Sequence, residues 1–309
     1  MTEEDPLEVF SSSLHSLFDH VVPANGDPLE LFSYNPPAST PPQPHLVCRI
    51  PPQQVNSLFA HHVWNASLIL ADRISTSNID GLEMVQKGGE DEGGMSVCEL
   101  GCGAGIPGLI AARSPKVKRV VLTDYDDSLL IENLRGNIEL AYKDDEPIQQ
   151  KLRALGHTWG ESQSLEKIFE LNDNERFTHV LMADTLWLTE AQTSLVSSLT
   201  KLLAFTPFAR IHLVAGFHSG RNAVRSFLRR AGEAGLEKKE VDGKEWEELA
   251  VGGEKRKWGW DLEGEEGRES DWIEEKESNS ERGKWVVVGE MGWSKEKLES
   301  EQSRSLSSC

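Results

Sequence analysis

The chain has 309 residues, a formal net charge of -19 and a mean hydropathy of -0.44, which fits one large domain with tails and a sizeable core. The acidic balance argues against a nucleic-acid backbone as the main partner, because phosphate contacts require clustered Lys and Arg. The sequence contains neither a long apolar run nor a secretion signal at its N-terminus. We therefore expect a cytoplasmic protein without membrane partners, which acts on a basic protein or a small molecule.

The N-terminal quarter is predicted to be irregular. Residues 1–20 have apolar spacings that predict a short amphipathic helix. Residues 23–52 hold much of the proline and predict an extended arm laid along a surface. The mostly apolar segment from Leu58 to Ala71 predicts a helix, and the glycine-rich, acidic residues 88–94 predict a loop.

A glycine-rich stretch organises the rest of the chain. Residues 96–100 predict a buried strand, the residues after position 108 suit a helix, and four glycines lie between them: Gly101, Gly103, Gly105 and Gly108. Glycines let the backbone approach a ligand closely, and the helix N-terminus offers unpaired N–H groups. This arrangement predicts a site for a nucleotide cofactor.

Two cofactor classes compete for this site. Gly103, Gly105 and Gly108 fit the dinucleotide spacing, but in a register that begins late after the strand. Glu99 followed by Gly-x-Gly-x-Gly instead resembles the first motif of S-adenosylmethionine-dependent methyltransferases. No Walker lysine follows the glycines, which excludes a nucleoside triphosphate loop.

A second acid supports a nucleoside. Residues 119–123 predict the next strand, which ends at Asp124, where a carboxylate can accept hydrogen bonds from both ribose hydroxyls. NAD-binding proteins share this acid, so it does not decide the cofactor. In the alternative interpretation Asp124 only begins an acidic turn and caps the helix that starts at Ser128.

Strands and helices alternate after the glycines. Further strands are predicted at 151–155, 178–182, 210–215 and 284–289, and helices at 128–141, 190–203 and 221–234. Strands separated by such helices need crossover connections and form a mostly parallel sheet. Gly101, Asp124 and Asp184 all follow predicted strands, at the sheet edge where such folds bind ligands.

The combined motifs resemble the seven-strand lysine methyltransferases of methyltransferase family 16. The resemblance is carried by Cys98 to Gly108, Leu122 to Tyr125 and residues 129–137, and by residues 179–187. Residues 27–32 and 61–66 are similar to a fungal branch first labelled nicotinamide N-methyltransferases. That branch is described as methylating the N-terminal glycine and adjacent lysine of translation elongation factor 1-alpha. The resemblance, about 27–293, implies the Rossmann-like, doubly wound, mostly parallel seven-stranded sheet of the class I methyltransferases.

The resemblance also implies roles for individual residues. The cofactor, S-adenosylmethionine, would contact Trp64, Gly101, Cys102, Gly103, Asp124, Trp159 and Ala183. Asp184 would face the acceptor amine, and Trp187 would replace the smaller ring of the family's Asp-x-x-Tyr/Phe motif. Without the resemblance, Trp64 and Trp159 would be interpreted as core residues. For Asp184, the alternative interpretation is a helix cap after the strand.

The remaining expectations concern boundaries, cysteines and alternative functions. We expect an N-terminal helix and arm at 1–52, a methyltransferase domain at 53–293 and a polar tail at 294–309. The acidic insert, at about 252–282, lies in a stretch with 14 acidic and 6 basic residues between positions 245 and 283. Four scattered cysteines predict buried thiols, without a metal site or disulfide. The main alternatives to a protein methyltransferase acting on elongation factor 1-alpha are a small-molecule amine methyltransferase, a catalytically silent interaction module and an NAD-dependent reductase.

Overall fold

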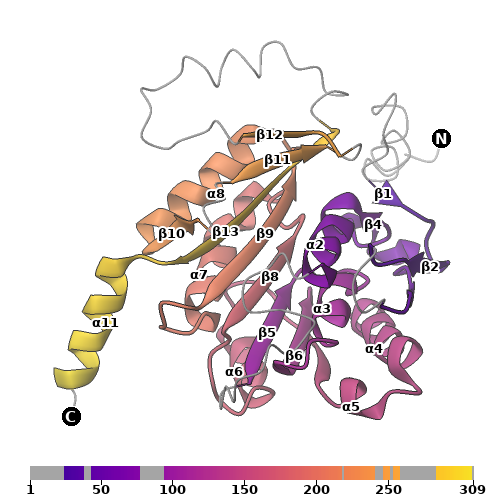
Figure 1. Ribbon diagram of the computed structural model, residues 1–309, viewed down its shortest axis with the longest axis horizontal. Helices are drawn as coiled ribbons and strands as arrows, with labels where there is room; N and C mark the ends of the chain where they lie inside the picture. The colour runs from indigo at the N-terminus through magenta and orange to yellow at the C-terminus, as the bar shows by residue number, and fades with distance from the viewer. Residues whose placement is uncertain are drawn as a thin grey trace, which may run out of the picture.

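The computed structural model describes residues 24–37, 43–76, 94–217, 219–240, 246–250, 253–257 and 283–307. Its centre is a nine-stranded sheet in the order β12-β11-β13-β9-β8-β5-β6-β7, with β10 also paired to β13. Figure 1 shows this sheet crossing the molecule between two layers of helices. The predicted helix at 1–20, most of the 88–94 loop and residues 258–282 of the acidic insert lie outside the described residues.

Five parallel strands form the middle of the sheet. They are β5 (Met95–Leu100), β6 (Val117–Asp124), β7 (Leu152–Gly156), β8 (His179–Ala183) and β9 (Arg210–Gly216). β5 pairs with β6 on one side and with β8 on the other, so the strand order reverses beside β5. In open α/β sheets this reversal opens a crevice at the carboxyl ends of the strands.

Side chains of the parallel strands alternate between two hydrophobic layers. Val97 of β5 belongs to the layer covered by α2 (Asn65–Ser75), α3 (Ile106–Ala111) and α4 (Ser128–Tyr142). Cys98, the next residue, belongs to the layer covered by α6 (Ser162–Glu170), α7 (Gln192–Leu202) and α8 (Arg221–Glu233). A strand buried on both faces is typical of a parallel sheet between helices. The predicted doubly wound α/β fold is therefore confirmed.

The sheet differs from the expected seven strands beyond β9. β13 (Trp285–Trp293) runs antiparallel to β9, and two separate segments, β10 (Leu236–Lys239) and β11 (Glu247–Ala250), pair with its two halves. β12 (Lys255–Lys257) adds a hairpin partner to β11. One strand position is thus filled by two segments, and the start of the predicted insert forms an extra strand.

The region before the glycine loop is less helical than predicted. η1 (Gln53–Leu58) is followed by β4 (Val63–Trp64), and α2 begins only at Asn65, so the predicted start at Leu58 is wrong. Residues 63–64 are extended because they pair with β1 (Ala24–Asn25). The Asn25 side chain of β1 donates to Val63 O and Asn65 Oδ1.

The arm and the tail also contain regular structure. β2 (Leu31–Tyr34) and β3 (Leu46–Arg49) pair within the expected arm and pack against α4 through Asn133 and Asn137. The remaining helical elements among the described residues are α5 (Glu146–Gln149), η2 (Thr189–Ala191) and α11 (Lys295–Ser307), a helix formed by the polar tail. In the part of the chain that the structure describes, no helix has both the length and the apolar character needed to cross a membrane.

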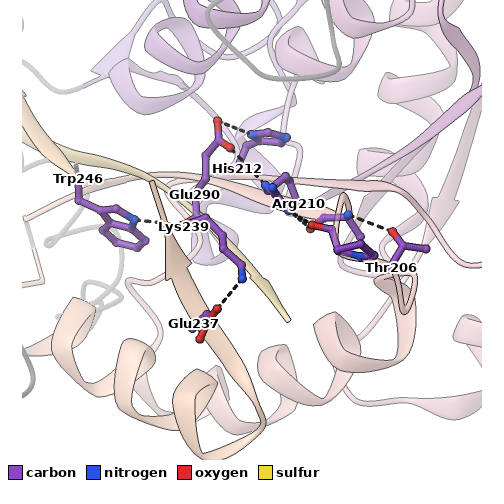
Figure 2. Close-up of polar contacts among 9 residues, drawn as sticks. Thr206, Arg210, His212, Glu237, Lys239, Trp246 and Glu290 are labelled. Carbon is purple, nitrogen blue, oxygen red and sulfur yellow. Dashed lines mark hydrogen bonds and ion pairs between the residues drawn. The ribbon is translucent and has the colours of Figure 1, made fainter. Parts of the chain in front are cut away.

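An ionised glutamate is buried at the end of the sheet opposite the crevice. Figure 2 shows Glu290 of β13 directed at His212 of β9, with Oε1 and Nδ1 3.3 Å apart and Arg210 Nε 4.0 Å from Oε2. Burial alone would raise the pKa of Glu290, but His212, Arg73 and Arg210 outweigh burial and hold the pKa below its usual range. The backbone of the same residue accepts from Trp246 Nε1 at 3.0 Å.

Replacing Gly289 by alanine is expected to destabilise this part of the sheet by about 1–3 kcal/mol. A Cβ at Gly289 would lie 2.1 Å from Cδ2 and Cε2 of the buried Trp246 ring. The free energy of unfolding in urea measures the effect. Gly232→Ala in α8, where an added Cβ meets open space, is the matched control and should not destabilise the protein. Equal stability of Gly289→Ala and the wild type would contradict the packing.

Candidate active site

The glycine loop leaves open space at its centre. Residues 101–105 connect β5 to α3, and Gly101 and Gly103 adopt φ values of 64° and 54°, which favour glycine. A Cβ at Gly103 would meet no atom within 4 Å, whereas one at Gly101 would lie 2.8 Å from Thr185 Cγ2. The loop is therefore tightly packed at Gly101 and open at Gly103, where a ligand can approach the backbone.

Asp124 lies at the carboxyl end of β6, beside the glycine loop. Its Oδ2 accepts from Gly103 N at 2.6 Å, and its Oδ1 accepts from Tyr125 N at 2.7 Å. Burial raises the pKa of Asp124 to about 6, although both hydrogen bonds oppose the shift. The helix that follows is capped by Asp127 instead, whose side chain accepts from Leu129 N and Leu130 N. The alternative interpretation of Asp124 as the helix cap is therefore wrong.

Glu99 supports the loop from within the sheet. This residue is 1% exposed, and its Oε2 accepts from Gly108 N at 2.8 Å. Among the described residues Oε1 has no hydrogen-bond partner. Burial raises the pKa of Glu99 to about 8, and the nearby Asp124 adds to the shift. The motif acid thus fixes the start of α3 and leaves one polar atom unsatisfied.

Trp159 lies beside Gly101, two residues after the buried His157. The position of a Cβ on Gly101 lies 3.5 Å from Cζ2 of Trp159. His157 donates its backbone N–H to Asp124 O at 2.7 Å, and its ring nitrogens contact Ser164 Oγ and Ser198 Oγ at 2.7 and 2.9 Å. Burial lowers the pKa of His157 to about 4, so the imidazole is neutral and structural. The half-buried indole offers an apolar face at the site.

The other predicted tryptophans meet through a residue that the sequence analysis missed. Phe59 contacts Trp187 with ring centroids 4.8 Å apart and Trp64 at 6.3 Å, both edge to face. Trp64 Nε1 donates to Phe59 O at 2.7 Å. Phe59 has φ 54°, an uncommon conformation for a bulky residue. No sequence pattern marks this position, because the ring is placed by the left-handed backbone.

Asp184 occupies a constrained position directly after β8. Its φ is 59°, its N–H donates to Val214 O at 2.8 Å, and its Oδ1 accepts from Gly216 N at 2.9 Å. The next helical element, η2, begins at Thr189 and has Leu188 as its N-cap, so Asp184 does not cap it. The carboxylate is half-buried at the end of β8, next to Ala183.

The structure brings the predicted residues together in three contacting groups. Gly101 lies near Trp159, Gly103 binds Asp124, and Trp64 joins Trp187 through Phe59. Cys102 is buried, as are Cys48 and Cys98, and its N–H donates to Thr123 O. His62 contacts Gly26 O through Nδ1 at 2.8 Å. No metal-binding group of three or more His, Cys, Asp or Glu occurs among the residues described.

Fold and site together define an α/β protein that binds a nucleoside-containing cofactor at a glycine loop. The acid after the second strand and the open backbone at Gly103 are the features that define this class. Residues 45–233 match the lysine methyltransferase family, and the chain belongs to that family.

Several curated fungal proteins are similar to this chain. A Schizosaccharomyces pombe protein named protein N-terminal and lysine N-methyltransferase efm7 is 28% identical over 56% of this chain. The chain spans 62% of that relative's length. Relatives of the same name from Yarrowia lipolytica and Neurospora crassa are 28% and 27% identical, over 60% and 68% of this chain and 68% and 66% of their own lengths.

Proposed function

We propose that this chain is an S-adenosylmethionine-dependent protein N-methyltransferase, which modifies the N-terminal amine and adjacent lysine of translation elongation factor 1-alpha in the cytoplasm. The names of the fungal relatives support a protein acceptor. The observation that carries the proposal is Asp124 bound to Gly103 N–H beside open space. An acid in this position beside a glycine loop can hold the ribose of a nucleoside cofactor.

The residues present fit the cofactor. The Asp124 carboxylate uses one acceptor position on each oxygen for backbone N–H groups and retains others for ribose hydroxyls. Trp159 offers an apolar face for adenine, while Gly101, Cys102 and Gly103 line the amino acid end, with Trp64 and Ala183 as further contacts. When bound, S-adenosylmethionine supplies the methyl group that is transferred.

Asp184 and Trp187 form the part of the site that receives the acceptor amine. A carboxylate attracts a cationic amine and orients it, and the aromatic wall of Trp187 and Phe59 excludes water from it. An N-terminal amine has an ordinary pKa near ~8 and loses its proton readily, whereas lysine, near ~10.4, depends on desolvation. The half-buried Asp184 therefore attracts and orients the acceptor amine. The reaction needs no covalent nucleophile.

The test is the intact mass of the N-terminal peptide of elongation factor 1-alpha after incubation with the protein and S-adenosylmethionine. We expect mass gains in whole methyl increments, mapped by fragmentation to the N-terminal amine and the neighbouring lysine. Nicotinamide is incubated in parallel. Methylation of nicotinamide but not of the peptide would replace the protein acceptor by a small molecule. Absence of S-adenosylmethionine binding by calorimetry would overturn the enzyme assignment.

A further inference from the structure

Two consecutive glutamates of β11 are held by arginines from opposite faces of the sheet. Side chains alternate along a strand, so Glu247 and Glu248 point in opposite directions. Glu247 contacts Arg73 of α2 at 3.2 Å, and this pair is partly exposed. Glu248 is 2% exposed and accepts two hydrogen bonds from Arg221, the first residue of α8, at 2.5 and 3.0 Å.

On the Glu248 side, two arginines contact one glutamate: Arg221 and Glu248 are buried, and Arg256 is partly exposed. Arg256 of β12 donates from Nε to Glu248 Oε2 at 2.6 Å, and its guanidinium lies 3.9 Å from the centre of the Trp285 ring. Arg221 is 0% exposed. We call Arg221, Glu248 and Arg256 the arginine–glutamate triad. It ties the β11–β12 hairpin, at the outer part of the sheet in Figure 1, to the start of α8.

One ring contact and one peptide bond separate the triad from the N–H group that donates to Asp184. The Arg221 guanidinium lies 4.0 Å from the centre of the buried Phe217 ring. Phe217 follows Gly216, whose N–H donates to Asp184 Oδ1. Glu248 pairs with Val287, and Val287 pairs with Ala215. Glu248 therefore lies across the sheet from Ala215, the residue before Gly216. The triad therefore lies next to the backbone segment whose N–H donates to Asp184.

The buried Arg221–Glu248 ion pair at the centre of the triad is a costly way to join a hairpin to a helix. Desolvating charged groups costs free energy, and apolar residues of similar size often stabilise a fold at least as well. Arg221 presents a planar, charged fork whose hydrogen bonds to Glu248 fix its orientation on the Phe217 ring. The bidentate pair thus holds the Arg221 guanidinium in one orientation against the ring of Phe217, the residue that follows β9.

We propose that the arginine–glutamate triad is a positioning unit of the active site, which fixes the turn after β9 and thereby the Gly216 N–H that orients Asp184. This inference rests on the proposed methyl transfer at Asp184. Arg221, Glu248 and Arg256 act through Phe217 and Gly216 and are positioning residues. Loss of the triad should impair the turnover of the acceptor and leave cofactor binding at the glycine loop intact.

The experiment compares Glu248→Gln with Glu247→Gln, the same substitution one residue away on the opposite face. For each full-length variant, S-adenosylmethionine affinity is measured by calorimetry and kcat and KM with the elongation-factor peptide. Hydrogen–deuterium exchange is measured over residues 214–217. In Glu248→Gln we expect kcat to fall about tenfold or more, exchange over 214–217 to accelerate, and cofactor affinity to stay unchanged. Glu247→Gln should match the wild type in all three.

A second variant covers the case in which Glu248→Gln does not fold. Arg256→Gln removes the more exposed arginine, 35% exposed, and leaves the buried Arg221–Glu248 pair in place. It should shift kcat and exchange in the same direction by smaller amounts. Wild-type kcat and exchange in a folded triad variant, or equal effects in Glu247→Gln, would overturn the proposal. If the wild type transfers no methyl group to the peptide, the proposed function fails, and exchange over 214–217 still decides the positioning role.

Discussion

Asp124→Ala is expected to weaken S-adenosylmethionine binding by about a hundredfold or more, because a charge-assisted hydrogen bond contributes about 1.5–3 kcal/mol and two ribose hydroxyls lose their acceptor. The substitution also leaves the N–H groups of Gly103 and Tyr125 without their carboxylate partner. Calorimetric titration of the variant with the cofactor measures the loss. The exposed Asp144, replaced by alanine in the same way, is the control and should bind like the wild type.

Asp124→Asn should be nearly as harmful as Asp124→Ala, although Asn has the same shape as Asp. Both carboxylate oxygens of Asp124 accept from backbone N–H groups, and a carboxamide has only one acceptor oxygen. Its NH2 group must therefore face the N–H of Gly103 or of Tyr125. An Asn variant with wild-type affinity would show that the carboxylate does not hold the ribose.

The pH dependence of binding provides a further check on Asp124. Burial raises its pKa to about 6 in the free protein, so the carboxyl is mostly protonated at pH 5 and mostly ionised at pH 7. Ribose hydroxyls donate to the ionised form, and binding should therefore strengthen roughly tenfold between these two values. Glu99, with its pKa raised to about 8, titrates mostly above this range. In Asp124→Asn this dependence between pH 5 and 7 should disappear.

Local patterns were sufficient to predict the parallel core of the fold. The strand before Gly101 and the strand ending at Asp124 are marked by short apolar runs followed by glycine or acid, and the structure places both as predicted. The same patterns located the Asp184 turn after β8. Such signals are contained within a few neighbouring residues, so a single sequence displays them.

Features that depend on distant contacts could not be predicted. Residues 58–64 are apolar enough for a helix, but pairing of β4 with β1 and the left-handed Phe59 prevent it. Trp64 and Trp187 were assigned from family resemblance, whereas Phe59, which contacts both, has no signal of its own. The division of one strand position into β10 and β11 is likewise visible only through their shared partner, β13.

Asp184→Asn is expected to reduce kcat/KM for the elongation-factor peptide by about 10²- to 10⁴-fold, the range found when a group positioned on the reacting atoms is removed. The carboxamide retains an oxygen that can accept from Gly216 N–H, and Asn tolerates the φ of 59° found at Asp184. The turn after β8 should therefore keep its shape. What is lost is the negative charge that attracts and orients the amine.

The measurement is the rate of methyl incorporation by intact mass, beside calorimetric binding of S-adenosylmethionine. Cofactor affinity should be unchanged, because the carboxylate that holds the ribose belongs to Asp124. Asp173→Asn is a closely matched control, since Asp173 is exposed and has a similar φ of 56°. It should methylate at the wild-type rate. Full activity of Asp184→Asn would show that another group orients the acceptor amine. Loss of cofactor affinity would instead make Asp184 a structural element of the cofactor site.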